Sequence, residues 1–482
     1  MPCAQEINET GAQHLQTILQ NILDTRERQR SEQDKSTFEI DGTIAVEAAE
    51  TYYAITWPQM KLHSVNGDTI KIGLIAMNAV PHDKPGQYKI TTAIPTPIIG
   101  QDKDGQEILR ITIGMQKAAG IFDESLNNFI KINTQLNDIQ ITFDGGKTLA
   151  TIPKLQLSYN FSEDDNARWS GPSYFEISDL KLTRPSESAA LSIEKFIVTS
   201  HLDSFAAQAL NGGIQHGKQA PLSPLQFSDG AEITLAISGL SASSPNSPEK
   251  NNKKNESFSL QSGAFNFRYE NALSGSAKAH TSFNFQNLIT NDIPQDLQML
   301  LPRTGSFSLT QHNIPLAEID ETLQNSTGVS GKILSLPLLL KIPSILAQAG
   351  SYLEIREAFF ENPEYRIDFD SILHADLTAV NSATATGTLR FAGLDKILSR
   401  AQVIGTNINS SPYALPVREL ARFLERLKPL GRVETNAEDG FVHIFNLEMN
   451  KKGQFLINGQ NASALLQEPK EPMLPAQQKI QP

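Results

Sequence analysis

Residues 333–349 read I-L-S-L-P-L-L-L-K-I-P-S-I-L-A-Q-A, and the interpretation of the whole chain starts from this apolar stretch. It is too short and too interrupted to cross a bilayer, which takes about 20 apolar residues. Pro337 and Pro343 each remove an internal hydrogen bond, so we expect a kinked or restarted helix. The polar residues that interrupt the run are Ser335, Lys341, Ser344 and Gln348.

So apolar a segment must be covered by other parts of the chain. Immediately after it, from Tyr352 to Ile355, apolar and polar residues alternate as in a β-strand. We therefore predict a mainly β fold with short helices (α+β), in which long curved antiparallel meander sheets wrap a few apolar helices. Residues 333–349 are predicted to be the most buried of these helices.

Composition excludes some classes of function. The chain has 482 residues, 20% of them charged, and a net charge of -12. Nucleic-acid binding favours clustered Lys and Arg, so this acidic balance argues against it. The same balance argues against simple electrostatic attraction to anionic lipid.

Cys3 is the sole cysteine, so the sequence predicts neither a disulfide framework nor a cysteine zinc site. Cysteine usage fits a bacterial periplasm, a secreted protein or the cytoplasm. Residues 1–4 lack the basic and apolar regions of a signal peptide. Cys3-Ala4 before Gln5-Glu6 fits the end of a removed leader, and it fits an ordinary cytoplasmic start equally well. We predict a periplasmic or secreted protein, with the cytoplasm as the alternative.

Residues 8–30 have the pattern of a helix that Asn8 or Thr10 can cap. An amphipathic helix can lie on a membrane or a partner, but a stripe of this size is ordinary for packing on a sheet, which we favour. The stripe consists of Leu15, Ile18, Leu19, Ile22 and Leu23.

From about residue 36 the apolar period changes to two, and glycine-containing turns separate the runs. We predict an N-terminal helix over 1–35, a first β-meander unit over 36–225, a second unit with apolar helices over 226–466 and a disordered tail over 467–482. A short helix is expected over 201–210, ended by Gly212 and Gly213, and another opened by Asp292 and Pro294. The polar stretch 241–257 is read as a long hairpin loop or as a domain boundary.

Motifs that suggest chemistry have simpler explanations. Gly145-Gly146-Lys147-Thr148 lacks the earlier glycine of a phosphate-binding loop, and we interpret it as a hairpin turn. Residues 102–107 resemble the start of a calcium loop but lack an oxygen ligand, so a polar turn is the better interpretation. The acidic loop 163–166 is interpreted as solvated.

Single aromatic and histidine side chains are assigned to packing as well. His443 alternates with aromatic residues on a predicted strand and is expected to be a hydrogen-bonded core or rim histidine. Trp57 and Trp169 are assigned to sheet packing rather than to a ligand wall. No catalytic residue, metal site or cofactor is predicted.

Several short motifs together suggest a family. An N-terminal amphipathic helix is followed by T-x-P-x-L-x-L strands such as 151–157. The motif G-D-T-I-K-I-G occupies residues 67–73. The sequence I-P-L-A-E-I over 314–319 lies between later meanders. The ensemble resembles uncharacterised periplasmic proteins of Alphaproteobacteria and, more distantly, AsmA-like envelope proteins. The resemblance implies an envelope-associated protein with long curved sheets that form an apolar groove, and it carries over no catalytic residue.

Two functions follow as expectations. The first is a non-enzymatic envelope or periplasmic protein that shelters a lipid or another apolar ligand in a groove between sheet and helix. The second is a structural or protein-interaction protein with a filled core and no ligand; a hydrolase ranks below both. No nucleic acid is expected as a partner, whereas peripheral association with the envelope is expected. The predicted groove residues are Leu336, Leu338, Leu339, Leu340, Ile342, Ile345 and Leu346.

Overall fold

The structure is a computed structural model that describes residues 6–31, 37–143, 145–183, 190–206, 228–243, 256–291, 293–326, 336–407, 413–436 and 440–465. The fold is mainly β with short helices and antiparallel strand pairing, which confirms the predicted class. The chain divides into two compact units, which are described separately. Unit 1 comprises Met1–Ser274 and Phe283–Asp292, and unit 2 comprises Gly275–Ser282 and Ile293–Pro482.

Unit 1 begins with α1 (Glu9–Ser31) and eight short strands. These are β1 (Thr37–Asp41), β2 (Ala45–Ala48), β3 (Tyr53–Trp57), β4 (Gln59–His63), β5 (Thr69–Ile72), β6 (Ile75–Pro81), β7 (Gln87–Ala93) and β8 (Ile98–Gln101). The long strands and one short bridge follow: β9 (Glu107–Asp123), β10 (Asn128–Phe143), β11 (Lys147–Asn160), β12 (Ser162–Glu163), β13 (Arg168–Thr183), β14 (Ala190–Ala206), β15 (Ser228–Ser243) and β16 (Glu256–Glu270). A short 3₁₀ turn, η2 (Ala272–Ser274), comes next, and β17 (Ala277–Thr290) contributes to both units.

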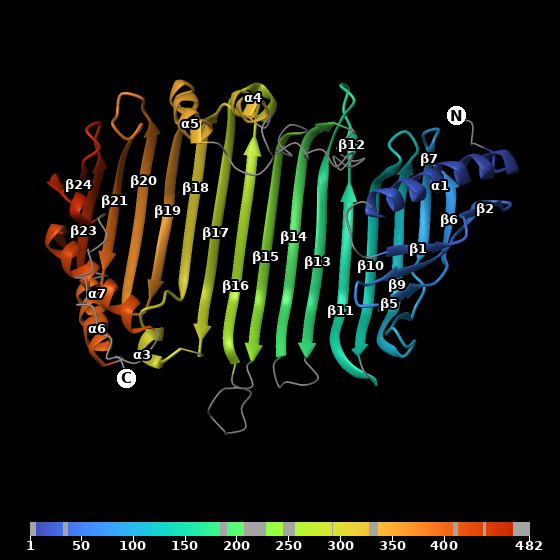
Figure 1. The fold of residues 1–482 in the computed structure, drawn as a ribbon, viewed down its shortest axis with the longest axis horizontal. Coiled ribbons are helices and arrows are strands. Elements are labelled where there is room, and N and C mark those ends of the chain that lie inside the picture. Colours follow the sequence, from blue (N-terminus) through green and yellow to red (C-terminus); the bar gives the residue numbers. More distant parts are fainter. Residues whose placement is uncertain are drawn as a thin grey trace, which may run out of the picture. The chain divides into compact units, whose positions relative to one another are not determined.

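Two branches of short strands meet on β9. One branch runs β2–β3–β6–β7 and pairs with the end of β9, and the other runs β1–β4–β5–β8 and pairs with its beginning. From β9 the sheet continues in chain order through β10, β11, β13, β14, β15 and β16, every pair antiparallel. Figure 1 shows these long strands side by side. Consecutive antiparallel pairing of this kind is the meander that the alternating sequence predicts.

The N-terminal helix forms as its sequence predicts. Asn8 caps it, because the Asn8 Oδ1 accepts a hydrogen bond from the backbone N–H of Gly11 at 2.9 Å. Leu15, Leu19 and Leu23 are buried against the sheet, with Ile18 and Ile22 packed at the margin. The helix is therefore a packing element on the sheet, as expected from its apolar stripe.

The turns between strands also match their sequences. Gly145 and Gly146 have positive φ between β10 and β11, so this segment is a hairpin and not a phosphate loop. In the turn before β9, the Asp102 carboxylate accepts bonds from the backbone N–H groups of Asp104 and Gln106. Asp164 does the same for Asn166 and Arg168. These carboxylates stabilise turns, as their sequences indicate.

One predicted helix in unit 1 is wrong. Residues 201–206 belong to β14, and Phe205 lies opposite Trp169 of β13 in the ladder. Phe205 and Trp169 are both buried in one cluster, so tertiary packing overrides the local pattern. The rest of that prediction, through Gly212 and Gly213, lies outside the described residues.

The stretch 241–257 connects β15 to β16, which are adjacent antiparallel strands. The hairpin interpretation is therefore the correct one, and residues 244–255 lie outside the described part. The division between the two compact units falls within β17. The predicted boundary near residue 226, and the tail over 467–482, stay predictions.

Unit 2 alternates short helices with strands. Its helices are α3 (Gln295–Gln298), α4 (Leu316–Ser326), α5 (Leu336–Gln348), α6 (Leu394–Asn407) and α7 (Ala414–Leu427), with 3₁₀ turns η3 (Lys428–Leu430) and η4 (Ser463–Leu465). Its strands are β18 (Thr304–Ile314), β19 (Tyr352–Asn362), β20 (Tyr365–Ala375), β21 (Ala383–Ala392), β22 (Arg432–Asn436), β23 (Gly440–Met449), β24 (Phe455–Ile457) and β25 (Gln460–Asn461).

The sheet of unit 2 runs β18–β19–β20–β21–β23, and β22 and β24 flank β23 on its other side. α4 and α5 lie at one end of its long strands, and α3, α6 and α7 lie toward the other (Figure 1). α6 and α7 cover the sheet through a buried cluster: Tyr365, Phe391, Leu394, Ile397, Leu398, Leu424, Leu427, Phe445, Ile457 and Ala462.

One expectation for unit 2 needs correction, and another is tested only in part. α3 begins at Gln295 after Pro294, without a side-chain cap bond, and it spans only four residues. In the helix from the 333–349 stretch, Pro343 lies inside α5 and Ile345 is buried, while Lys341 and Gln348 are exposed. Fully buried leucines occur instead in α1 (Leu15) and α6 (Leu394). The side chains before Lys341 lie outside the described part, so the burial predicted for the complete stretch is untested there.

Candidate functional site

The long strands of unit 1 form a sheet with one apolar face and an opposite face on which polar side chains are more frequent. Directly paired residues of antiparallel strands share a face, and the strand pairing forms one continuous row from β11 to β16. This row, which is entirely apolar, consists of Leu157, Phe175, Val198, Leu235 and Phe265. The adjacent row on the other face is entirely polar and consists of Ser158, Tyr174, Thr199, Thr234 and Asn266.

We call the first surface the apolar face. Rows two residues to either side extend it. Its members on β11–β16 are Leu155, Leu157, Tyr159, Ser173, Phe175, Ile177, Phe196, Val198, Ser200, Ile233, Leu235, Ile237, Gly263, Phe265 and Phe267. On β10 the three rows continue with Leu136, Thr134 and Ile132.

The apolar face continues past residues where strict alternation would end it. Asp138, Asp179 and Gly239 have positive φ and lie on alternate strands, β10, β13 and β15. Leu136 and Ile139, three residues apart across Asp138, nevertheless pack in one cluster. A left-handed residue within a strand therefore moves the alternation by one position, as in a β-bulge.

The pattern on the neighbouring strands is consistent with the same shift. Beyond it, the paired row is again apolar and consists of Ile141, Ala150, Leu182, Leu191, Ala242 and Phe258. The row next to it is polar: Thr151, Lys181, Ser192, Ser241 and Ser259. The spacing of three is visible in the sequence as Ile177–Leu180 and Ile237–Leu240, a signal that simple alternation misses.

Exposure changes along this face. One paired row runs from Ala79 and Ile90, under α1, to Ile233 and Phe267. Ala79 is 0% exposed and Ile90 3%, whereas Ile233 is 36% exposed. The cluster beneath α1 ends at Phe122 of β9 and Phe129 of β10.

The exposed part of the apolar face belongs to β11–β16. Leu157 is 37% exposed and Phe265 36%. Phe175, Val198 and Leu235 belong to none of the buried clusters of the described residues. A continuous apolar surface of this kind marks a binding site more often than a lone exposed side chain does.

The opposite face carries a buried carboxylate. Glu176 is 4% exposed and accepts hydrogen bonds from Tyr174, from Ser178 at 2.7 Å and from Lys154 at 3.1 Å. The bonds from Tyr174 and Ser178, with that from Lys154, lower the pKa of Glu176 to about 2, and the Glu176 carboxylate raises the pKa of Tyr174 to about 12. Neither group exchanges a proton near neutral pH, so the cluster joins β11 and β13 and does not serve as an acid or base.

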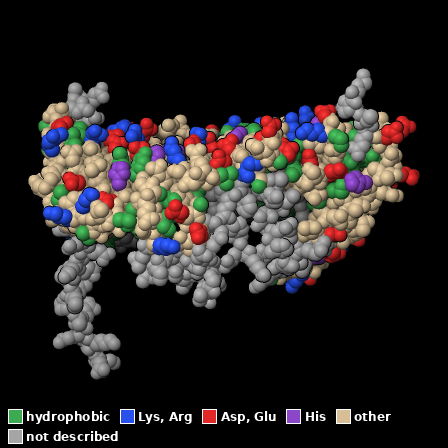
Figure 2. Space-filling model, turned by 90° about the horizontal axis from the view of Figure 1, so that it is seen from above, with side chains coloured by type: hydrophobic (Ala, Val, Ile, Leu, Met, Phe, Trp, Pro, Cys, Tyr) green, Lys and Arg blue, Asp and Glu red, His purple; other side chains and the backbone are tan. Residues whose placement is uncertain are grey.

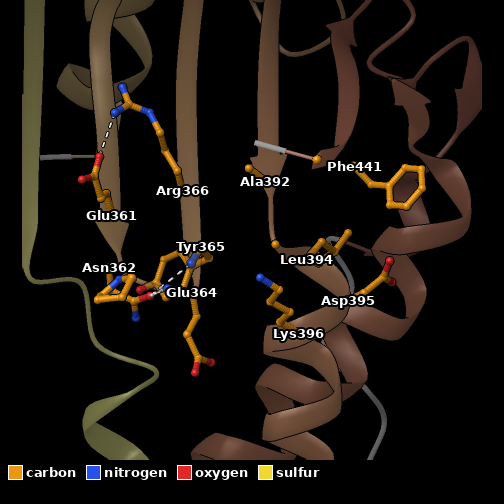
Figure 3. Close-up of a pocket in the computed structure, with 13 residues that line it drawn as sticks. Glu361, Asn362, Glu364, Tyr365, Arg366, Ala392, Leu394, Asp395, Lys396 and Phe441 are labelled. Atoms are coloured by element: carbon orange, nitrogen blue, oxygen red, sulfur yellow. Dashed lines mark hydrogen bonds and ion pairs between the residues drawn. The ribbon is translucent and has the colours of Figure 1, made fainter. Parts of the chain in front are cut away.

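Unit 2 contains a cavity of about 550 Å³ between the ends of β19, β20 and β21 and the start of α6 (Figure 3). Four of its five charged lining groups, Glu361, Glu364, Arg366 and Asp395, are paired, and the fifth is Lys396. Arg366 binds Glu361 at 2.7 Å and Asp368 at 2.8 Å. Glu364 pairs with Arg400 of α6.

The other polar groups of the cavity are also engaged with the protein. Tyr365 donates to the backbone carbonyl of Leu300 at 3.0 Å, and burial raises the pKa of Tyr365 to about 12. Asp395 binds Lys428 at 2.6 Å. The lining groups thus serve the packing of α6 and present no arranged nucleophile and base.

His443 is buried, as expected, but its Nδ1 has no hydrogen-bond partner in the described structure. Burial lowers the pKa of His443, so the ring is neutral, and it stacks on Phe445. The prediction of a hydrogen-bonded histidine is therefore wrong for this nitrogen. Across the described ranges, no group of three or more His, Cys, Asp and Glu side chains is placed to hold a metal ion.

Both tryptophans pack as predicted. Trp169 is buried with Phe205, and Trp57 packs at the edge of the cluster under α1. Figure 2 shows Lys and Arg side chains interspersed with Asp and Glu on the described surface of that view, without a broad field of one sign. Among the helices that the structure describes, none combines the length and apolar content of a membrane span.

The predicted groove residues all belong to α5, which contacts β20 in unit 2. Ile345 is buried there, and Ile342 and Leu346 are half-buried. The side chains of Leu336, Leu338, Leu339 and Leu340 lie outside the described part. A role for these seven residues in ligand binding stays a prediction, and none of the residues of the apolar face of unit 1 is among the predicted groove residues.

No family model, curated protein or solved structure matches the chain. The resemblance to AsmA-like envelope proteins thus stays a prediction from short motifs, and the function has to be argued from the site.

Proposed function

We propose that the protein is a non-enzymatic envelope or periplasmic protein that shelters a lipid chain or another apolar ligand on the apolar face of β11–β16. The observation that carries the proposal is the row Leu157, Phe175, Val198, Leu235 and Phe265, apolar on every strand and exposed at both ends. The adjacent row on the other face is polar, which supports a sheet that presents one face to water and the other to an apolar ligand.

The energetics favour an apolar ligand. A ligand that removes about 200 Å² of apolar surface from water contributes about 5 kcal/mol, before the cost of immobilising it. The dimensions suit an acyl chain as well. At about 3.3 Å per residue, the apolar run of β13 is on the order of 30 Å long. This is about the hydrocarbon thickness of a whole bilayer, so the face is long enough for an extended acyl chain, which spans one leaflet.

The alternative is a structural or protein-interaction protein without a ligand. It is supported by the two regions in which helices already fill the sheet surface, under α1 and under α6 and α7. The periplasmic or envelope location is part of the main proposal, and fractionation of cells for the native protein tests it.

Lipid extraction and mass spectrometry of the purified chain separate the two functions. The proposal expects copurified lipid, and it expects an apolar fluorescent dye to bind with saturation and to be displaced by fatty esters. A protein that carries no lipid and binds no apolar dye contradicts the ligand proposal and supports the structural alternative.

A further inference from the structure

Two serine hydroxyl groups, those of Ser173 and Ser200, lie on the apolar face. Ser173 of β13 and Ser200 of β14 are direct partners in the ladder, and their Oγ atoms lie 2.6 Å apart. Tyr159 and Ile233 continue the row on either side, and Phe175 and Val198 form the next pair along the strands. Both serines are half-buried, so a ligand that covers this row also covers the hydroxyl pair.

The pair does not use all of its own hydrogen-bonding capacity. Each serine hydroxyl has one proton and two acceptor lone pairs. One proton lies between the two oxygens, and the second hydroxyl proton is left to donate elsewhere. A donor covered by hydrocarbon without an acceptor costs more than the gain of covering a methylene group. A ligand with an oxygen acceptor at this point therefore binds better than a plain hydrocarbon.

The surroundings select the kind of acceptor. The paired positions around the serines are Tyr159, Ile233, Phe175 and Val198, none of them a cation. An ionised carboxylate or a phosphate would lose its hydration there without a compensating charge. A neutral ester carbonyl accepts a hydrogen bond at much lower desolvation cost. The site thus favours the ester end of an acyl chain.

A second serine pair shows what is particular about the first. Ser192 and Ser241 also pair across β14 and β15, with Oγ atoms 2.8 Å apart. Their row contains Lys181 and Ser259 and belongs to the polar face. Water reaches that face in the presence of a ligand on the other side, so this pair provides a matched control.

We infer that the Ser173–Ser200 hydroxyl pair is a specificity-determining group that selects neutral ester-bearing acyl chains over hydrocarbons of equal length. This inference rests on the proposed function, because it places the ligand on the same apolar face.

The test uses the full chain and displacement of an apolar fluorescent dye by methyl hexadecanoate and by hexadecane. The wild-type protein is expected to bind the ester about tenfold more tightly than the alkane, the effect of one hydrogen bond. The double variant Ser173→Ala/Ser200→Ala should bind both within about twofold of each other, because the ester loses its hydrogen bond and the alkane no longer covers an unpaired donor. The control Ser192→Ala/Ser241→Ala should keep the wild-type preference.

The outcomes separate the two claims. Wild-type protein that binds both ligands equally, or a Ser173→Ala/Ser200→Ala variant that keeps the ester preference, overturns the role of the serine pair and leaves the proposed function standing. Wild-type protein that binds neither ligand nor the dye overturns the proposed function, and the serine inference falls with it.

Discussion

Two regions of the unit 1 sheet present the same kind of surface to different surroundings. Under α1, Leu15 and Leu19 complete a closed cluster with Ile90, and these side chains are nearly or fully buried. On β11–β16 the same face continues with Leu157 and Phe265, which are more than one third exposed. The difference lies in what covers the strands and not in their side chains. Among the described residues, an apolar sheet face thus forms a core where α1 covers it and stays partly exposed where no described helix does.

The largest expected effect is on stability. Leu15→Ala empties a filled site and should lower the free energy of unfolding by about 3 kcal/mol. Leu157→Ala removes a side chain that is already partly in water and should cost about 1 kcal/mol or less. Denaturant unfolding followed by tryptophan fluorescence measures both. Equal losses would mean that the exposed region is packed as tightly as the covered one.

The polar side of the exposed region gives the next effect. The folded-state pKa of Glu176, about 2, lies below its ordinary value of 4.5, so its contribution is present above that ordinary value and is lost as pH falls toward 2. Glu176→Gln should remove this acid-side loss and lower stability at neutral pH by about 1–3 kcal/mol. Unfolding curves between pH 2 and pH 7 test it, with the exposed Glu163→Gln as control. A Gln variant whose pH profile matches wild type would mean that the Glu176 carboxylate is not the source of the acid-side loss of stability.

Continuity of the apolar face depends on the left-handed residues. Asp179→Val places a β-branched side chain at φ 53° and should cost about 1–2 kcal/mol, whereas Asp179→Asn should be nearly neutral, because Asn tolerates this conformation. Thermal unfolding compares the two variants. If valine is accepted as readily as asparagine, the shift in alternation does not require that backbone conformation.

The smallest effect concerns the helix-covered face of unit 2. Burial lowers the folded-state pKa of His443 below 6.5, so the unfolded chain binds the extra proton and stability falls as pH drops below about 6.5. His443→Phe keeps an aromatic ring, slightly larger than imidazole, and removes an unpaired nitrogen; the two effects oppose each other, so stability at pH 7 should change by less than about 1 kcal/mol. The decline below pH 6.5 should shrink in the variant. An unchanged decline would mean that His443 is not its source.

The sequence predicts single elements well and their combination poorly. The cap at Asn8, the stripe of α1 and the glycine turns are local, and each is confirmed. The local pattern around Phe205 predicts a helix, whereas the residue forms a strand because its partner, Trp169, lies 36 residues earlier in the chain. An apolar sheet face is expected from the sequence, but its residues are not, because each strand contributes only a few alternating residues and their alignment depends on register and on the shift at Asp138, Asp179 and Gly239. Residues 333–349, by contrast, are conspicuous in the sequence because their apolar side chains are contiguous.

The most direct test of the central claim places one charge on each face of the same strand. Leu235 and Thr234 are neighbours on β15 and lie in the apolar and the polar row. The account predicts that Leu235→Lys weakens binding of an apolar dye at least tenfold, while Thr234→Lys binds as wild type and both variants keep the wild-type circular dichroism spectrum. Equal dye binding by Leu235→Lys and wild type would contradict the claim that this face holds the ligand.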